Sequence, residues 1–260
     1  MISYILEFIV NNSFSDFQVM MQVKCLEADL KSIAINYMIH NSILEKTNTL
    51  INEFTIGDYT RRVDLAVVKS NRLYAYEIKS EADTLVRLPG QIESYLEYFD
   101  KVTVISARKH IKKILEMAPQ NVEVWEIHSE KLNIIRRGKT NIVTDKLKFL
   151  ELMTVADLIK IARAENVLLN SYRRNAIQQR LIYLPKFKLR KYALEALQER
   201  YKSTNSDFFQ RVSERFYTKS EDLYLLRSKK VEKLDAKLDV NDLLEALQNL
   251  EDELLPLSSA

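Results

Sequence analysis

The stretch RRVDLAVVKSNRLYAYEIKS, residues 61–80, constrains the fold more than any other part of the sequence. Two runs rich in Val, Leu and Tyr, 62–69 and 72–79, have the length and composition of β-strands. Only the polar pair Ser70-Asn71 separates them, which is typical of a hairpin turn. We therefore expect two adjacent strands joined by a tight turn.

The charged residues of this hairpin predict a site. Side chains alternate between the two faces of a strand, so Glu77 and Lys79 share one face while Ile78 points into the core. The hairpin can bring Asp64 beside Glu77, and two carboxylates with a lysine are costly to bury without partners. Mg²⁺ prefers oxygen ligands of this kind. We expect Asp64, Glu77 and the carbonyl of Ile78 to bind Mg²⁺, or Mn²⁺ in its place. Lys79 would then assist a water or a phosphate in phosphodiester hydrolysis.

The remainder of the first 145 residues alternates between helical and strand patterns. Helices are predicted over 25–40, 90–99 and 108–117, and further strands over 50–56, 101–107 and 121–127. The order of elements, helix, three strands, helix, strand, helix and strand, is that of an α/β sandwich. We expect residues 1–145 to form this α/β domain.

Residues 146–260 have helical periodicity throughout and are predicted to form an all-helical region. Residues 146–202 carry 13 Lys or Arg against 5 Asp or Glu, whereas residues 203–260 carry 8 against 12. The basic part predicts a surface that faces anions. The acidic tail, 232–255, has a leucine face that could pack on the chain itself or on a second copy, so a homodimer through this region is one expectation.

The hairpin residues have a counterpart in a known family. Asp64 followed by Glu77-Ile78-Lys79 resembles the signature of the PD-(D/E)XK nuclease superfamily. The segment QIESY then places Gln91 and Tyr95 in a Q-x-x-x-Y pattern similar to that of the RecB-type branch. The resemblance implies a restriction-endonuclease-like core, a mixed central sheet flanked by helices, in which Gln91 and Tyr95 orient the site and the DNA. Spacing of four residues would put these two on one helix face.

The resemblance covers residues 25–127 and looks closest to an uncharacterised bacterial branch. It implies a Mg²⁺-dependent deoxyribonuclease in DNA repair, restriction or conflict with mobile elements. The alternative is a module on the same fold that binds DNA or another partner without cutting. An acid from the first helix completes the family's metal site, and Glu27 is preferred here, with Asp29 and Glu53 as rivals.

Contacts with DNA are expected outside the metal site as well. Arg87 lies close in sequence to Gln91, and the basic region adds Arg173, Arg174, Lys188 and Arg190. Clustered cations give the sequence-independent part of nucleic-acid affinity. The competing interpretation is a pair of amphipathic helices whose cations only face water. The cations are interleaved with four aromatic residues, Tyr172, Tyr183, Phe187 and Tyr192.

Composition places the chain among soluble globular proteins, with 47% hydrophobic and 29% charged residues. Its single cysteine, Cys25, permits no disulfide within the chain, so a reducing cytoplasm is the expected compartment. No apolar run is long enough to span a membrane. The opening MISYILEFIV has no preceding basic residue and is interpreted as structure rather than a signal peptide.

Overall fold

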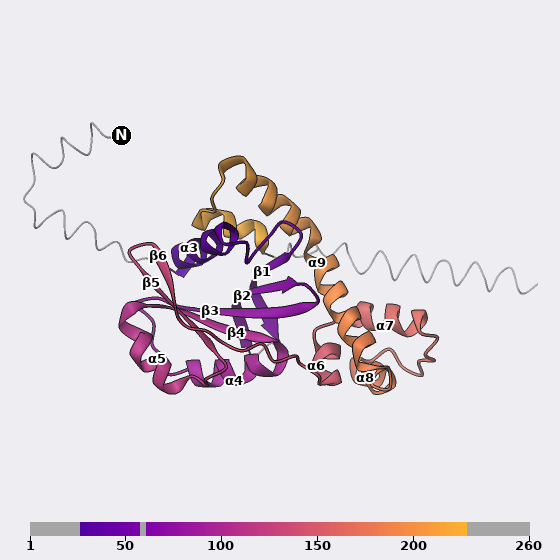
Figure 1. The fold of residues 1–260 in the computed structure, drawn as a ribbon. Helices are drawn as coiled ribbons and strands as arrows, with labels where there is room; N and C mark the ends of the chain where they lie inside the picture. Colours follow the sequence, from indigo (N-terminus) through magenta and orange to yellow (C-terminus); the bar gives the residue numbers. More distant parts are fainter. Residues whose placement is uncertain (1–26, 58–60, 228–260) are drawn as a thin grey trace, which may run out of the picture. The chain divides into compact units, whose positions relative to one another are not determined.

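The computed structural model describes residues 27–57 and 61–227, and a six-stranded mixed sheet lies at their centre (Figure 1). The strands follow chain order across the sheet. The β1–β2, β2–β3 and β5–β6 pairs are antiparallel, whereas β3–β4 and β4–β5 are parallel. The bounds are β1 Thr49–Ile56, β2 Arg61–Lys69, β3 Arg72–Lys79, β4 Lys101–Ala107, β5 Glu123–His128 and β6 Lys131–Arg136.

All five predicted strands are present, and β3 and β4 have the predicted bounds. The predicted hairpin turn is also confirmed. Ser70 and Asn71 both have positive φ, 50° and 58°. Two consecutive left-handed residues form the type I′ turn, whose twist matches that of the flanking strands. The turn therefore fixes the register that pairs β2 with β3.

Strand β6 was not predicted from the sequence. It pairs with β5 through a second two-residue turn, in which Ser129 and Glu130 have φ of 48° and 61°. The strand is at the edge of the sheet, and most of its side chains are at least partly exposed. Its sequence, KLNIIR, is short and carries charges at both ends, so it lacks the apolar signal of the interior strands.

Helices cover both faces of the sheet (Figure 1). The predicted helices over 25–40, 90–99 and 108–117 correspond to α3, α4 and the pair η1–α5, with small shifts of the ends. The helical region after residue 145 is confirmed as far as it is described. The bounds are α3 Glu27–His40, α4 Leu88–Tyr98, η1 Arg108–His110, α5 Ile111–Met117, α6 Lys146–Glu151, α7 Val155–Ala164, α8 Arg174–Leu181, α9 Lys186–Arg215 and η2 Ser220–Leu226.

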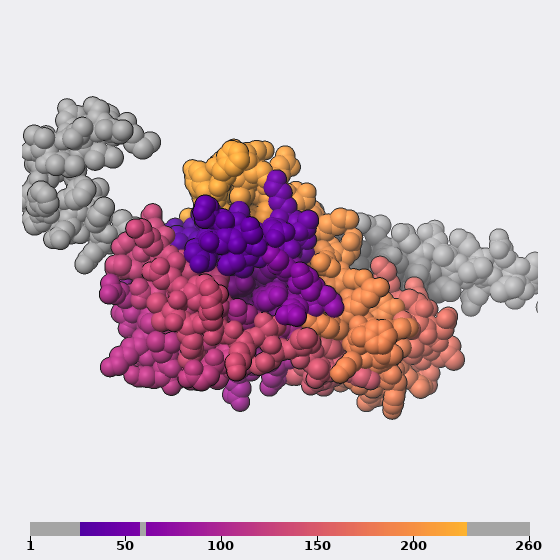
Figure 2. Space-filling model, viewed as in Figure 1, coloured from indigo at the N-terminus to yellow at the C-terminus, as the bar shows by residue number. Residues whose placement is uncertain are grey.

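Each face of the sheet has its own hydrophobic core. On one face, α3, η2 and the end of α9 pack over strand residues such as Ile78, which points into that core as predicted. The atoms of α3 and η2 adjoin at the surface (Figure 2). On the other face, α4 and α5 pack over residues such as Ala75 and Val104. Both faces are therefore buried, which explains why β3 and β4 read as nearly continuous apolar runs.

The core on the α4 face continues into the helical region. Phe149 of α6, Leu158 of α7 and Leu197 of α9 belong to the same buried cluster as Val104 of the sheet. The predicted boundary at residue 145 therefore marks a change of secondary structure within a continuous core. Within the described residues, no helix is both long and apolar enough to cross a membrane. The predicted tail helix, Cys25 and the opening apolar segment lie outside the described residues.

At one pair of facing residues in β1 and β2, the alternation of side chains between the two faces of the sheet is interrupted. Ile51 and Phe54 are three residues apart, yet both pack in the core on the α4 face. Between them Glu53 has a φ of 59°, which is strained for a residue with a side chain and moves the following residues to the other face. The facing residue on β2 is Asp64, because the pairs on either side of this level are Asn52↔Leu65 and Phe54↔Val63. Two acids thus face each other at a local bend in the sheet.

Candidate active site

Glu77 is the centre of a buried polar cluster on β3. The residue is 2% exposed, and its Oε1 accepts hydrogen bonds from Nζ of Lys79 and Nε2 of Gln91, both at 2.6 Å. Its Oε2 accepts a hydrogen bond from the hydroxyl of Tyr95 at 2.8 Å. Four residues singled out from the sequence therefore meet at one carboxylate. Gln91 and Tyr95 lie on the same face of α4, as predicted, with Nε2 of Gln91 3.4 Å from the tyrosine oxygen.

The surroundings of Tyr95 keep it a hydrogen-bond donor. Burial, followed by the charge of Glu77, raises the pKa of Tyr95 well above its ordinary value. Its hydroxyl also lies 2.9 Å from the carbonyl oxygen of Arg62. The side chain of Gln91 is held less completely, because its Oε1 is buried without a hydrogen-bond partner among the described residues.

Asp64 lies across the hairpin from Glu77. Its Oδ2 accepts a hydrogen bond from the backbone N–H of Ile78 at 2.7 Å. Burial, followed by the charge of Glu77, raises the pKa of Asp64 to about 8, and the ammonium of Lys31 opposes this shift. The Asp64 carboxyl is therefore mostly protonated at neutral pH unless additional positive charge approaches it.

Two further acids join Asp64, and the sequence could not choose between them. Carboxylate oxygens of Glu27, on α3, and Glu53, on β1, lie with one of Asp64 in a group whose members are within 4.8 Å of one another. The rival Asp29 does not belong to this group. Three acids were considered as the additional metal ligand, and the structure brings two of them, Glu27 and Glu53, close to Asp64. We call the set of Glu27, Glu53, Asp64 and Glu77 the acidic cluster.

Lys31 lies among these acids and was not predicted. Its side chain is 4% exposed, and Nζ is 2.7 Å from Glu27, 3.6 Å from Asp64 and also in contact with Glu53. Burial lowers the pKa of Lys31, but the three carboxylates outweigh burial and raise the pKa above its usual value. The spacing of Glu27 and Lys31, four residues along one helix, is the only local signal that could have indicated the pair.

The acidic cluster combines four carboxyl groups with three cations. The cations are the buried ammonium groups of Lys31 and Lys79, and Arg62, which is 68% exposed and binds Glu53 at 2.6 Å. With Asp64 protonated, the remaining three carboxylates balance these three cations. The available donors are carboxylate oxygens, which is the donor set of hard divalent cations such as Mg²⁺. The carboxylate oxygens therefore match the ligands that the predicted Mg²⁺ prefers. A bound cation would replace part of the contacts that Lys31 makes with these carboxylates.

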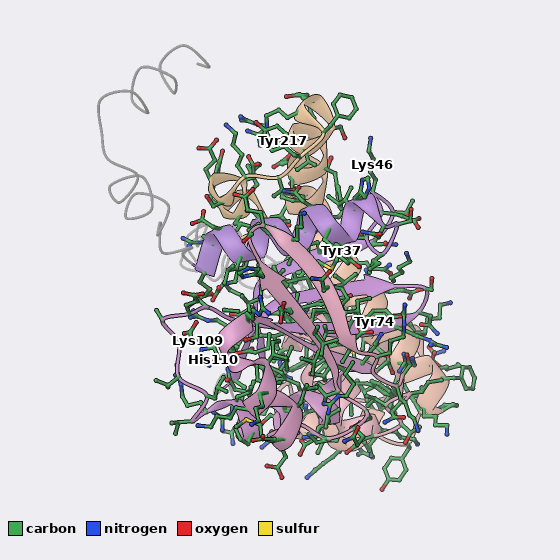
Figure 3. The ribbon with its side chains drawn as sticks, turned by 60° about the vertical axis from the view of Figure 1, so that its left-hand side comes forward. Tyr37, Lys46, Tyr74, Lys109, His110 and Tyr217 are labelled. Atoms are coloured by element: carbon green, nitrogen blue, oxygen red, sulfur yellow. The ribbon has the colours of Figure 1, made fainter. Side chains whose placement is uncertain are left out.

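The loop after β3 is anchored next to this cluster. Asp83 accepts hydrogen bonds from the backbone N–H and the hydroxyl of Ser80, at 2.7 and 2.5 Å. From the other side, Nζ of Lys109 donates to the carbonyl of Glu81, and Nε2 of His110 lies 3.1 Å from the carbonyl of Ser80 (Figure 3). The loop that leads from Lys79 to α4 is therefore held at its start.

The residues predicted to contact DNA differ in how the structure uses them. Arg87 and Arg173 are exposed. Arg174 donates to the carbonyls of Leu150 and Met153, and Lys188 binds Glu165 at 2.7 Å. Arg190 is 2.6 Å from Asp100, in a pair whose side chains are 11% and 1% exposed. Internal contacts thus account for Arg174, Lys188 and Arg190, and the two exposed arginines stay the candidates for phosphate contact.

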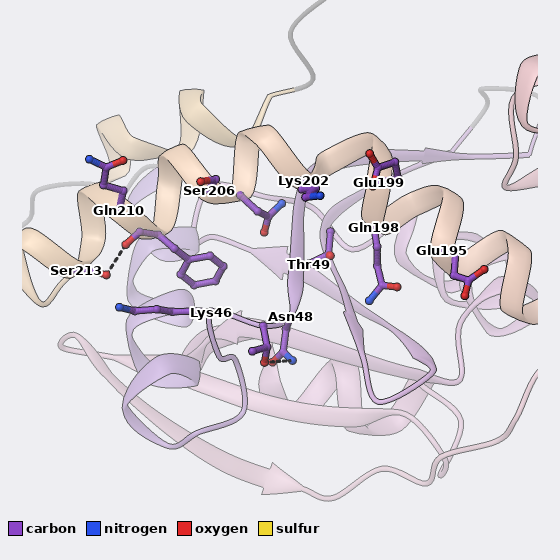
Figure 4. Close-up of a pocket in the computed structure, with 13 residues that line it drawn as sticks. Lys46, Asn48, Thr49, Glu195, Gln198, Glu199, Lys202, Ser206, Gln210 and Ser213 are labelled. Carbon is purple, nitrogen blue, oxygen red and sulfur yellow. Dashed lines mark hydrogen bonds between the residues drawn. The ribbon is translucent and has the colours of Figure 1, made fainter.

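The cavities of the described residues include one along α9 and one beside the end of β1. One, of about 680 Å³, runs along α9 and is lined by polar groups that include Lys46, Gln198 and Lys202 (Figure 4). Its buried amide, Asn205, is bonded to the backbone of Leu50. The other, of about 920 Å³, lies between the end of β1 and the helices α6 to α9. Neither cavity is lined by a residue of the acidic cluster.

Comparison with known proteins places the chain in a family. The family model described as Bacteriophage P4 protein cII matches residues 20–227. Protein cII of Enterobacteria phage P4 is 27% identical over 209 residues, which is 78% of each chain. A solved structure, the SPO1766 protein of unknown function from Silicibacter pomeroyi, is 16% identical with a TM-score of 0.36, covering 54% of this chain and 90% of its own. None of these names states an activity. Because the family model matches well over half of the sequence, the chain belongs to the Bacteriophage P4 protein cII family.

Proposed function

We propose that the protein is a metal-dependent nuclease that hydrolyses phosphodiester bonds of DNA. The observation that carries the proposal is the buried Glu77 carboxylate, bound by Lys79, Gln91 and Tyr95, with Asp64 facing it across a hairpin. The resemblance of these same residues to the PD-(D/E)XK signature supports it. Perturbed acids that share a confined site with a lysine are more common at functional sites than on solvated strand faces.

The acidic cluster would hold the cation. Asp64 is the central ligand in this proposal, together with Glu27 and Glu53, because one carboxylate oxygen of each lies within 4.8 Å of the others. Glu77 is outside that group of three, and its carboxylate and the carbonyl of Ile78 are proposed as further oxygen donors. A bound Mg²⁺ or Mn²⁺ would supply Lewis-acid activation of a water and of the phosphate. The raised pKa of Asp64 supports a cation here, because added positive charge is what would return this buried carboxyl to its ionised form.

The protein's own groups would do the positioning. Gln91 and Tyr95 hold both oxygens of Glu77 and so fix the orientation of the carboxylate. The ammonium of Lys79 is 2.6 Å from Glu77 and keeps further N–H donors for a water or a phosphate oxygen. A lysine held in this way stabilises charge that develops on a phosphate without reorganising during the reaction.

Binding of DNA would use exposed cations, one beside α4 and one on the helical region. Arg87 immediately precedes α4, the helix that carries Gln91 and Tyr95. Arg173 immediately precedes α8 in the basic part of the chain, 146–202. Both are proposed phosphate contacts, since exposed arginines add to affinity without sequence preference. A cytoplasmic site of action and a homodimer formed through the C-terminal region belong to the same proposal.

A second candidate function is a module that binds DNA or another partner without cutting it. Lys31 favours this candidate, because its ammonium already neutralises part of the cluster formed by Glu27, Glu53 and Asp64. Both oxygens of Glu77 are also hydrogen-bonded within the protein. The site is therefore able to persist without a cation, as a purely structural network would.

Cleavage of defined DNA substrates separates the two candidates. Closed circular DNA, linear duplex, single-stranded DNA and RNA would be incubated with Mg²⁺ or Mn²⁺, using the wild type, Glu77→Ala and Lys79→Ala. The nuclease predicts metal-dependent cutting that both substitutions abolish, and nicking of closed circles would identify an endonuclease.

Circular dichroism of each variant provides the folding control. A folded wild type that binds DNA but cuts none of these substrates with either metal would contradict the nuclease and leave the binding module. Cutting that persists in folded Glu77→Ala would place the chemistry elsewhere in the chain.

A further inference from the structure

The cleft between the end of β1 and the helical region has features of a binding site outside the acidic cluster. Its volume is about 920 Å³. Thr55 and Gly57 line it from the β1 side, and apolar side chains such as Leu152 and Met153 line it from the helical region. A cavity of this size and mixed lining is large enough for an organic ligand with both apolar and hydrogen-bonding groups.

The polar side of the cleft is formed by amides on α8. Asn175, Gln178 and Gln179 all line the cleft, and their three- and four-residue spacing places them on one face of the helix. Gln178 is only 9% exposed, and its side-chain amide has no hydrogen-bond partner in the described part of the chain. Its polar atoms are not sealed from solvent, so the amide is available to a group that enters the cleft.

Charge around the cleft is compatible with a ligand attached to phosphates. Arg174 and Arg200 line it together with Glu151. Arg174 is bound to backbone carbonyls, which leave its charge in place, whereas Arg200 is paired with Asp157 at 2.8 Å. An amide side chain can donate and accept hydrogen bonds side by side, which matches the edge of a nucleobase. Apolar surface beside the amides would cover the faces of such a base. The lining therefore fits a nucleotide unit better than a neutral lipid or a bare anion.

The cleft is also placed within reach of a strand bound at the acidic cluster. Thr55 and Gly57 follow Glu53 along the same chain by two and four residues. At about 3.3 Å per strand residue, they lie about 7 to 13 Å beyond that acid. Stacked nucleotides in a DNA strand are spaced about 3.4 Å apart along the axis. A base two to four nucleotides from the bond at the cluster would therefore reach the cleft.

We propose that this cleft receives an unstacked base of the DNA strand, and that Gln178 hydrogen-bonds the edge of that base. The inference rests on the proposed nuclease function and adds a substrate class to it. Removing a base from the stack is least costly in single-stranded or frayed DNA. The preferred substrate is therefore a single strand or an unpaired end rather than a continuous duplex.

Binding measured without cleavage tests the inference. A fluorescein-labelled single strand of mixed sequence would be titrated with the full chain in EDTA, followed by anisotropy. Gln178→Leu should weaken binding about tenfold, the loss expected when one amide-to-base contact is removed. The matched control is Gln198→Leu, an exposed glutamine of the other cavity on α9, which should bind as the wild type does.

A strand of the same length without bases distinguishes base from phosphate contacts. The wild type and Gln178→Leu should bind this abasic strand equally. Asn175→Ala, at an exposed position of the same cleft, should weaken binding of the intact strand severalfold and covers the case in which Gln178→Leu misfolds. Equal affinity of the folded cleft variants and the wild type for the intact strand would overturn the inference while leaving the nuclease proposal intact. A wild type that binds no DNA in EDTA and cuts none with metal would overturn both.

Discussion

Replacing Lys31 with methionine probes the balance of charge in the acidic cluster. Methionine retains most of the length of the side chain but removes the ammonium that contacts Glu27, Glu53 and Asp64. Breaking a fully buried ion pair costs about 3–5 kcal/mol. Here two partners are partly exposed, with 51% of the Glu27 side chain and 25% of the Glu53 side chain accessible. We therefore expect a loss of about 2–3 kcal/mol in the free energy of unfolding in EDTA.

A divalent cation should reverse this loss. If Mg²⁺ or Mn²⁺ uses the same carboxylates, it stabilises Lys31→Met more than the wild type, because no ammonium competes with it. Urea unfolding with EDTA and with several millimolar Mn²⁺ measures both effects. Lys191→Met is the matched control, since that lysine is 68% exposed and 3.8 Å from Glu195, so its loss should change stability little. A variant as stable as the wild type in EDTA, or one that Mn²⁺ does not stabilise, would refute the reasoning.

Three further predictions concern stability and binding. The pKa of Asp64 is raised from 3.8 to about 8, so the folded state holds one more proton than the unfolded state between these pH values. The free energy of unfolding in EDTA should therefore fall as pH rises from 4 to 8. Asp64→Asn should reduce that slope in urea titrations. Arg190→Ala should lower the free energy of unfolding by about 3–5 kcal/mol because it leaves the buried Asp100 carboxylate unpaired; an unchanged urea midpoint would show that this arginine has no structural role. Arg87→Ala and Arg173→Ala should leave unfolding unchanged, but each should reduce the slope of log DNA affinity against log salt by about one.

The site could be predicted where it depends on local spacing. Asp64, Glu77 and Lys79 lie on one hairpin, and Gln91 and Tyr95 are one turn apart on a helix. Period and turn chemistry fix such neighbours whatever the remainder of the chain does. Their convergence on one carboxylate depends on how α4 lies against β3, which spacing alone did not fix and only the resemblance implied.

The contributions that were missed or left open depend on distant segments. Lys31 meets Glu53 only because α3 packs beside the bend in β1. The bend itself could not be predicted, because the residue with positive φ is Glu53 and not a glycine. Arg190 was interpreted as a DNA contact because it lies in a cluster of cations. Its ion-pair partner, Asp100, is 90 residues away in the chain and could not be recognised from the sequence. Charge in a sequence predicts a surface or an ion pair equally well until the fold brings the partner close.

The rate of DNA strand cleavage in Glu77→Gln tests the central proposal most directly. The substitution keeps the shape of the side chain but removes the charge at the point where Lys79, Gln91 and Tyr95 converge. The matched control is Glu93→Gln, an exposed position on α4. With Mn²⁺ and excess enzyme, we predict cleavage by the wild type and by the control, and a loss of at least about a hundredfold in Glu77→Gln. Equal rates in the folded variant and the control would contradict the assignment of this carboxylate to catalysis.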